Sequence, residues 1–240
     1  LRFTTGAASG WRFQLSPRII GPILLMWTIC IVVLIWQRDL GAAVLFFMVF
    51  LLLLYVASGS LRILLMGGLL IVAAAIVAYS LISLVRLRID IWLNPFGDPD
   101  GRSYQLVQSL MAFGAGGLFG EGLGQGAPYY IPVVHSDFIF ASLAEEWGLL
   151  GVIVCVACLA ALIMRGLKIA IVQTGKPFQA LFAVGLSAII AVQSLLIMGG
   201  VMALAPLTGV TLPFFSYGGS SLLTNFVIIG LLLRLSSGEN

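Results

Sequence analysis

Charged side chains are scarce in this chain, and their scarcity decides its class. Only 9% of its 240 residues are Asp, Glu, Lys or Arg, whereas 61% are hydrophobic. A soluble domain carries roughly a quarter charged residues, so this composition cannot cover a surface that faces water. The sequence therefore predicts an all-α, polytopic transmembrane helical bundle and excludes an ordinary soluble domain.

Residues that bind zinc or carry redox chemistry are also few. The chain has one histidine, His135, and three cysteines, which all fall within apolar runs. Cys155 and Cys158 form a C-x-x-C pair, but no second pair or nearby histidine accompanies it. Because a zinc site draws three or four such ligands, helix packing is the favoured interpretation of these cysteines. A G-x-S-x-G nucleophile elbow is absent as well, which argues against a serine hydrolase.

Long apolar runs are abundant instead. A helix needs about 20 apolar residues to cross the hydrocarbon of a bilayer, and about six segments approach this length. They are 19–36, 40–58, 63–84, 138–164, 178–198 and 221–235. The mixed, polar start of the chain lacks the apolar core of a signal peptide. No linker or internal repeat divides the sequence, so residues 1–240 are expected to form a single membrane domain.

The placement of Lys and Arg predicts the orientation in the membrane. The side of the termini carries Arg2, Arg12, Arg18, Arg62, Arg165, Lys168, Lys176 and Arg234, and the other side carries Arg38, Arg86, Arg88 and Arg102. Cytoplasmic loops hold the excess of these residues, so both termini are expected in the cytoplasm. The net charge of +3 follows from this topology and indicates no nucleic-acid partner.

A polar segment between Arg86 and Glu146 interrupts the apolar runs. It holds seven of the nine acidic residues, and carboxylates beside lipid are costly enough to mark a functional site. We expect an extracytoplasmic loop over residues 86–137. Within it, the apolar spacing of Ser103–Phe113 predicts a short amphipathic helix that carries Gln105 and Gln108.

Two glycine-rich segments accompany this loop. Gly114–Gly126 contains seven glycines, and Met198–Ser221 contains five glycines and two prolines. Irregular backbone at membrane depth is tolerated only inside protein or beside a wet cavity. These re-entrant segments are therefore expected to converge on one cavity that opens outward. The first segment can bind phosphate through backbone N–H groups or simply be a flexible loop, and the two interpretations are compatible.

Asp137 stands where the polar segment meets the apolar run that starts at Phe138. Desolvation at such a boundary favours the protonated form of a carboxyl group, which lets it act as a general base near neutral pH. The alternative is a helix N-cap formed by Ser136 or Asp137. The residues alone do not separate the two.

The other carboxylates receive structural interpretations. Glu145 and Glu146 follow about two turns into the same helix, and with Asp39 they are interpreted as ion-pair partners of arginines on their side of the membrane. Asp98 and Asp100 lie in a turn-rich stretch. They leave open a Mg²⁺ or Mn²⁺ site that also uses a substrate phosphate.

Five motifs occur in a characteristic order. They are Gln37–Ala43, similar to a PDLG turn; Asn94–Ser109, similar to P…GxxYQxxQS; Gly116–Gly124, similar to GGxxGxGLG; Asp137–Gly151, similar to DFIFAxxAEELGLxG; and Pro206–Ser221, similar to a terminal signature. Through them the chain resembles the SEDS family (shape, elongation, division and sporulation) of FtsW, RodA and SpoVE. Arg38 stands where the family usually has Pro, and Trp147 where it usually has Leu.

The resemblance implies an inverting peptidoglycan glycosyltransferase in the bacterial cytoplasmic membrane. It implies that lipid II and an undecaprenyl-linked glycan are the substrates, with Asp137 as the base that takes the proton of the lipid II GlcNAc 4-hydroxyl. It also implies a class B penicillin-binding protein transpeptidase as partner and about ten spans, so the family's N-terminal spans are expected to be missing here. The residues expected to bind substrate are Arg38, Arg86, Arg88, Arg102, Gln105, Gln108, Gly122, Gly124, Ser216, Gly218, Gly219 and Ser220.

Two other functions stay open at this point. Broken, glycine-rich segments and buried carboxylates are also typical of a lipid II flippase or an ion-coupled transporter, although the inverted repeats that favour transport are not found. A truncated chain can instead be an inactive scaffold that binds the transpeptidase.

Overall fold

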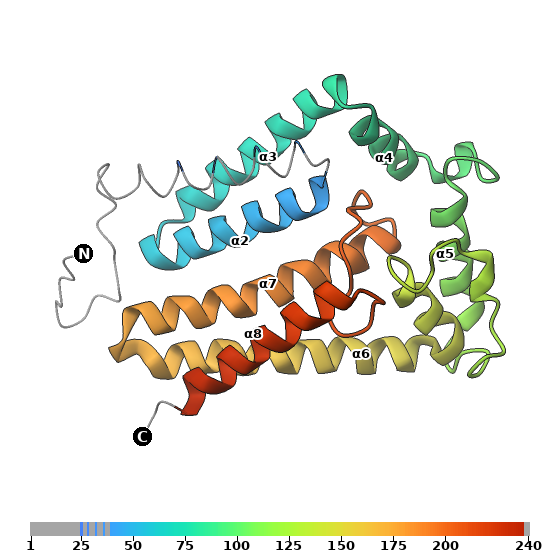
Figure 1. Cartoon of the computed structure of the whole chain (residues 1–240). Helices are drawn as coiled ribbons and strands as arrows, with labels where there is room; N and C mark the ends of the chain where they lie inside the picture. Colours follow the sequence, from blue (N-terminus) through green and yellow to red (C-terminus); the bar gives the residue numbers. More distant parts are fainter. Residues whose placement is uncertain (1–24, 26–27, 29–31, 33–35, 37–38, 238–240) are drawn as a thin grey trace.

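The structure is a computed structural model that describes residues 25, 28, 32, 36 and 39–237 (Figure 1). Arg38, Cys30 and most of the predicted first span, 19–36, lie outside the described residues. Within them, regular structure consists of seven α-helices, α2 to α8, and three 3-10 turns, with no strand. The prediction of an all-α fold is confirmed.

Five of the described helices are long and apolar enough to cross a membrane. They are α2 (Leu40–Ser58), α3 (Leu61–Leu81), α6 (Ile139–Val172), α7 (Pro177–Val201) and α8 (Gly219–Ser237). At 34 residues, α6 exceeds the length that the hydrocarbon requires. It therefore carries side chains from the membrane region into a polar end of the bundle.

Helix α7 lies at the centre of the bundle, between α2 and α6 (Figure 1). Its most apolar window is 56% buried, whereas that of α3 is 6% buried. Small residues permit the close packing of α6 on α7, because a Cβ at Gly166 would collide with the hydroxyl of Ser187. The exposed apolar surface of α3 suits contact with acyl chains.

The long helices of the bundle meet at two ends (Figure 1). One end, here called the Asp137 end, gathers the starts of α2 and α6, the end of α7, and the helices α4 (Ser83–Leu93) and α5 (Tyr104–Gly116). The opposite end holds the turn after α2, the 173–176 turn and the end of α8. Residues that are far apart in sequence therefore meet at the Asp137 end.

The first part of the predicted 86–137 loop is helical, which corrects that boundary. The chain bends at Ile82, whose backbone is extended (φ −115°, ψ 110°), and α4 begins at Ser83. Leu84, Leu87 and Ile91 have helical spacing and line one cavity, so the apolar face of α4 has a partner that local sequence does not reveal. The run predicted over 63–84 is thus divided between α3 and α4.

Helix α6 is interrupted near its start, and the glycine-rich loop after α5 fills the interruption. Gly148 has φ 63° and ψ −162°, a region open essentially to glycine alone. Backbone bonds from the loop replace those that α6 loses: Leu149 N–H donates to Gly117 O (2.9 Å), and Glu121 N–H donates to Glu145 O (2.9 Å). The glycine-rich segment is therefore built into α6 as an ordered structural insert.

Candidate active site

Asp137 lines a cavity of about 200 Å³ at the Asp137 end of the bundle. The other polar side chains in this lining are Arg88 of α4 and Arg102 and Gln105 at the start of α5. The remaining lining residues are apolar or glycine: Leu84, Leu87, Ile91, Leu106, Phe138, Ile197, Leu207 and Gly209. This space, here called the Asp137 cavity, combines one carboxylate and two guanidinium groups on an apolar wall.

The carboxylate of Asp137 is free of protein partners among the described residues. Asp137 is half-buried, and the N-cap of α6 is Phe138, which forms no side-chain cap bond. The structure thus favours the free carboxylate over the capping interpretation. The backbone beside it is fixed: Phe138 is buried, and His135 O accepts a hydrogen bond from Tyr217 N–H at 2.8 Å. A fixed, unbonded carboxylate facing a cavity is well placed to accept a proton.

Arg88 is held in the Asp137 cavity by the irregular segment before α8. Its Nη1 donates to the carbonyl oxygen of Thr208 at 2.9 Å. The next residue, Gly209, has φ 73° and lies against both Arg88 and Asp137. A Cβ at Gly41, at the start of α2, would collide with the same Thr208 carbonyl. The start of α2 therefore supports the carbonyl that orients Arg88.

The turn before α5 brings Arg102 to the Asp137 cavity, and the first turn of α5 brings Gln105. The Asp98 carboxylate accepts the backbone N–H of Arg102 at 3.1 Å, which fixes the turn before the helix. Gln105 Nε2 donates to Pro132 O at 3.4 Å, in the loop that leads to Asp137. One turn further along the same face of α5, the buried hydroxyl of Ser109 donates to Val201 O at the end of α7 (2.9 Å). These bonds attach α5 to the loop before Asp137 and to the end of α7.

Several residues predicted to bind substrate lie elsewhere. Arg86 donates to the carbonyl oxygens of Tyr79 (3.2 Å) and Ser80 (3.0 Å) and so folds back on α3. The backbone N–H of Gly122 is occupied by Glu146 O. The predicted residues that are missing from the lining of the Asp137 cavity are Arg86, Gln108, Gly122, Gly124, Ser216, Gly218, Gly219 and Ser220. Arg38 lies outside the described residues.

The terminal signature acts locally as a polar anchor for the segment that holds Arg88. Ser216 is buried and its hydroxyl accepts Leu212 N–H at 2.7 Å. Gln193 of α7 donates to both the carbonyl (2.8 Å) and the hydroxyl (3.1 Å) of Thr211. The Thr211 and Ser221 hydroxyls are 2.6 Å apart. This network fixes the irregular backbone between α7 and α8, because these buried polar groups find partners within the segment and on α7. Among the described residues, the Thr208 hydroxyl is buried without a hydrogen-bond partner.

The predicted ion pairs of the carboxylates are not present among the described residues. No Lys or Arg nitrogen of this part of the chain lies within 4.0 Å of Asp39, Glu145 or Glu146. Asp39 instead caps α2 by accepting Ala42 N–H at 3.0 Å. Glu145, only 6% exposed, accepts Ala127 N–H at 2.9 Å. Among the described residues, backbone N–H groups are therefore the hydrogen-bond donors to Asp39 and Glu145.

Few of the described side chains are placed to coordinate a divalent cation. The described residues contain no group of three or more His, Cys, Asp and Glu side chains that can hold a metal. Asp98 and Asp100 are exposed, and Asp98 already accepts the Arg102 N–H. These two residues do not by themselves fit a resident Mg²⁺ or Mn²⁺, since such ions need about six oxygen ligands.

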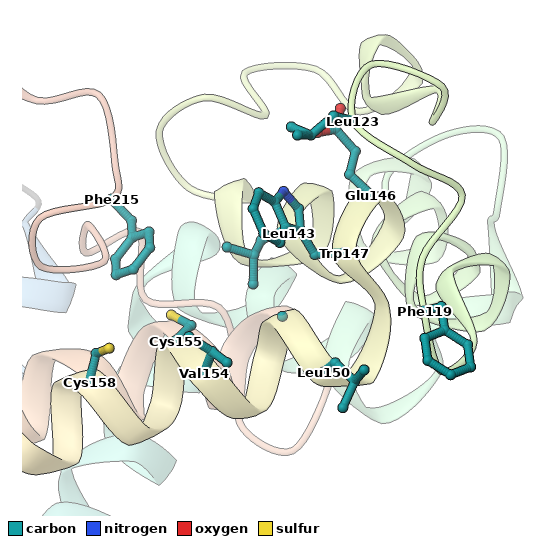
Figure 2. A pocket seen from close by; sticks show the side chains of 11 residues that line it. Phe119, Leu123, Leu143, Glu146, Trp147, Leu150, Val154, Cys155, Cys158 and Phe215 are labelled. Carbon is teal, nitrogen blue, oxygen red and sulfur yellow. The ribbon is translucent and has the colours of Figure 1, made fainter.

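A second, apolar cavity of about 610 Å³ lies along the first half of α6 (Figure 2). Figure 2 shows Trp147, Val154 and Cys155 on the helix, with Phe119 and Phe215 on loops at either side. The Cys155–Cys158 pair belongs to this wall, and both thiols are free. Their location agrees with a packing interpretation of the C-x-x-C pair.

Sequence reasoning missed Gly209, Thr208 and the apolar face of α4. The only signal for Gly209 was its place in the irregular stretch between Met198 and Ser221. Nothing local distinguishes it from the other glycines there. Its importance comes from the two side chains that it faces.

The sequence of this chain is similar to that of a known protein family. Residues 7–240 match the sequence model of the FtsW, RodA and SpoVE family, described as a cell cycle protein. The chain belongs to this family. It is 44% identical over 222 residues to "Peptidoglycan glycosyltransferase RodA" of Mycobacterium bovis and of Mycobacterium tuberculosis, which covers 92% of this chain and 47% of each relative. It is 35% identical over 218 residues to "Probable peptidoglycan glycosyltransferase FtsW" of Geobacter sulfurreducens, covering 90% of this chain and 58% of that protein.

A solved structure has the same fold. It matches with a TM-score of 0.74 and 27% identity, over 90% of this chain and 61% of the other. Its title is "Structural coordination of polymerization and crosslinking by a peptidoglycan synthase complex". The chain spans about half the length of the curated relatives it matches, so the described helices are one part of the family architecture.

Proposed function

We propose that this chain carries the polymerising centre of a peptidoglycan glycosyltransferase that joins lipid II into glycan strands. The observation that carries the proposal is the free, half-buried carboxylate of Asp137 in a cavity with Arg88 and Arg102. The names of the relatives support it, because RodA and FtsW proteins of this family are called peptidoglycan glycosyltransferases.

In the proposed reaction, Asp137 accepts the proton of the GlcNAc 4-hydroxyl of lipid II. The hydroxyl oxygen forms a bond to the anomeric carbon of the undecaprenyl-linked glycan, on the face opposite the diphosphate. The carbon–oxygen bond to the diphosphate breaks, and the leaving group takes the electron pair. Positive potential from Arg88 and Arg102 stabilises the charge that develops there. A divalent cation, if one takes part, has to be held largely by substrate oxygens.

The size of the Asp137 cavity and the apolar surface of the bundle agree with a substrate that has a polar head and a lipid tail. The Asp137 cavity, at about 200 Å³, is smaller than the roughly 300–1,000 Å³ of common ligand pockets. It suits the reacting end of one sugar, with the rest of the glycolipid outside. The apolar surface of the bundle suits the polyprenyl chain.

We place the protein in the bacterial cytoplasmic membrane with the Asp137 end outside and both termini in the cytoplasm. The five described spans support a multi-pass membrane protein. Arg62, Arg165, Lys168, Lys176 and Arg234 belong to the half of the bundle opposite Asp137, as the positive-inside rule requires of a cytoplasmic face. A class B penicillin-binding protein is the proposed partner, because the solved relative belongs to a complex that couples polymerisation to crosslinking.

The decisive experiment is Asp137→Asn, made in this chain and at the matching position of a full-length relative. Purified protein in nanodiscs is given lipid II, and glycan length is read on gels. We expect polymerisation to fall by about 10²–10⁴, the usual effect of losing a general base, with the thermal unfolding midpoint unchanged. Full activity of a folded Asn variant contradicts the proposal.

The same preparation separates the alternatives. A wild-type protein that moves labelled lipid II between leaflets without making glycan is a flippase. A chain that binds the transpeptidase but never polymerises, with or without that partner, is a scaffold.

A further inference from the structure

Gly209 faces the two side chains of the Asp137 cavity that carry opposite charge. A Cβ placed on Gly209 would lie 3.4 Å from Nη2 of Arg88 and 4.0 Å from Oδ2 of Asp137. Both distances are ordinary van der Waals contacts. Because Gly209 has no side chain, nothing projects from this residue toward the guanidinium and the carboxylate, and the space beside it in the Asp137 cavity stays open.

The two atoms that border this space have no partner among the described residues. Arg88 uses Nη1 for the Thr208 carbonyl, which leaves Nη2 with its protons uncommitted. Asp137 neither caps α6 nor lies within ion-pair distance of Arg88. A cation and an anion that share a cavity without pairing leave room for a third group.

The chemistry of that third group follows from its neighbours. It has to accept a hydrogen bond from Nη2 and donate one to Oδ2. A sugar hydroxyl does both. The diphosphate of the leaving group has no proton to donate at neutral pH, and the nearby carboxylate repels it.

We propose that the space in front of Gly209 is the seat of the attacking sugar hydroxyl, with Arg88 and Asp137 as its two hydrogen-bond partners. This assignment rests on the proposed glycosyltransferase function and names the group that the cavity recognises. Arg88 holds the hydroxyl oxygen through Nη2, and Asp137 receives its proton. Arg102, in the turn before α5, is left for the diphosphate.

Glycine is required at position 209 for two reasons. Its φ of 73° belongs to the left-handed region that L side chains rarely adopt. More specifically, a methyl group at 209 would lie in van der Waals contact with both Nη2 of Arg88 and Oδ2 of Asp137, and would crowd a hydroxyl that binds between them. The first effect is general strain, and the second is loss of one hydroxyl site, so a matched control can separate them.

The test compares Gly209→Ala with Gly59→Ala. Gly59 has a similar φ of 65°, follows α2 at the other end of the bundle, and has nothing within 4 Å of an added Cβ. Each variant, in nanodiscs, is titrated with lipid II that bears a short, water-soluble prenyl chain, and with the 4-deoxy form of the same molecule. Binding is read from tryptophan fluorescence, so no turnover is needed.

We expect wild type and Gly59→Ala to bind the 4-hydroxy form about tenfold more tightly than the 4-deoxy form, the usual effect of a hydrogen bond to charged groups. Gly209→Ala should bind both forms within about twofold. Should it fail to fold, Arg88→Lys serves, because the single nitrogen of an ammonium lacks the two fixed nitrogen positions with which the guanidinium holds Thr208 O and the hydroxyl separately. It should lose the discrimination as well.

The outcomes test the proposed hydroxyl site and the proposed glycosyltransferase function separately. If wild type binds both forms equally, or if Gly209→Ala or Arg88→Lys still discriminates, the seat is wrong. Polymerisation of full-length lipid II is measured on the same wild-type preparation. If wild type polymerises lipid II but binds the 4-hydroxy and 4-deoxy forms equally, only the proposed hydroxyl site is wrong. If it binds the 4-hydroxy form more tightly but does not polymerise lipid II, the hydroxyl site is supported and the proposed function is wrong.

Discussion

Arg88 Nη1 donates a hydrogen bond to the carbonyl oxygen of Thr208, a residue 120 positions further along the chain (2.9 Å). This bond joins α4 to the irregular segment between α7 and α8. It also holds Arg88 in the Asp137 cavity, whereas Arg86 folds back on α3. A contact of this range fixes the site only once the whole bundle has folded.

The contrast between Arg86 and Arg88 tests this geometry. Arg88→Gln should lower polymerisation by about tenfold or more, because it removes a charged donor from the Asp137 cavity. Arg86→Gln should change it by less than about threefold, since exposed interactions with α3 contribute little. The measurement is the initial rate of glycan synthesis from lipid II. Equal losses in the two variants would contradict the assignment of Arg88.

Glu145 should behave as an acceptor of a backbone hydrogen bond and not as an ion-pair partner. Glu145→Gln keeps an oxygen for Ala127 N–H, and should unfold within about 0.5 kcal/mol of wild type, as changes that leave a bond intact usually do. Glu145→Ala leaves that N–H unsatisfied and should cost about 1–3 kcal/mol. Thermal unfolding in detergent checks both. A Gln variant as unstable as the Ala variant would restore the ion-pair interpretation.

Gly148 should be intolerant of any side chain. Its backbone angles (φ 63°, ψ −162°) are nearly closed to other residues, and an added Cβ would collide with the backbone N of Gly120. We expect Gly148→Ala to destabilise the protein by about 3 kcal/mol or more. Gly230→Ala in α8, where nothing lies within 4 Å of an added Cβ, should be neutral or slightly stabilising. Comparable unfolding midpoints would show that the break in α6 is not required.

The contacts at the break in α6 could not be predicted from the sequence. The glycine-rich stretch was expected to be irregular. Its hydrogen bonds to residues 145–150 were not expected, because neither segment's sequence indicates that the two meet. Similarly, Glu145 beside a polar segment suggested an arginine partner, whereas the backbone of Ala127 supplies the bond. Long-range pairing chooses among partners that local patterns leave equivalent.

Other features followed from local physics. The apolar runs predicted helices that can cross a membrane, because the requirement for about 20 apolar residues acts on each segment independently. The placement of Asp137 at the boundary of such a run indicated a carboxylate near water and lipid together. Ordered motifs carried the family resemblance.

By itself, then, the sequence determined the membrane class, the presence of several long apolar helices and the carboxylate at the polar boundary, since each depends on the hydrophobic content of one continuous stretch. Only the tertiary structure decided that Arg88, Arg102 and Gln105 share a cavity with Asp137, that Arg86 does not, and that Gly209 leaves the space beside it in this cavity open. The reason is geometric: α4, α5, α6 and the segment before α8 approach one another through packing on α7, and no local period of the sequence encodes that approach.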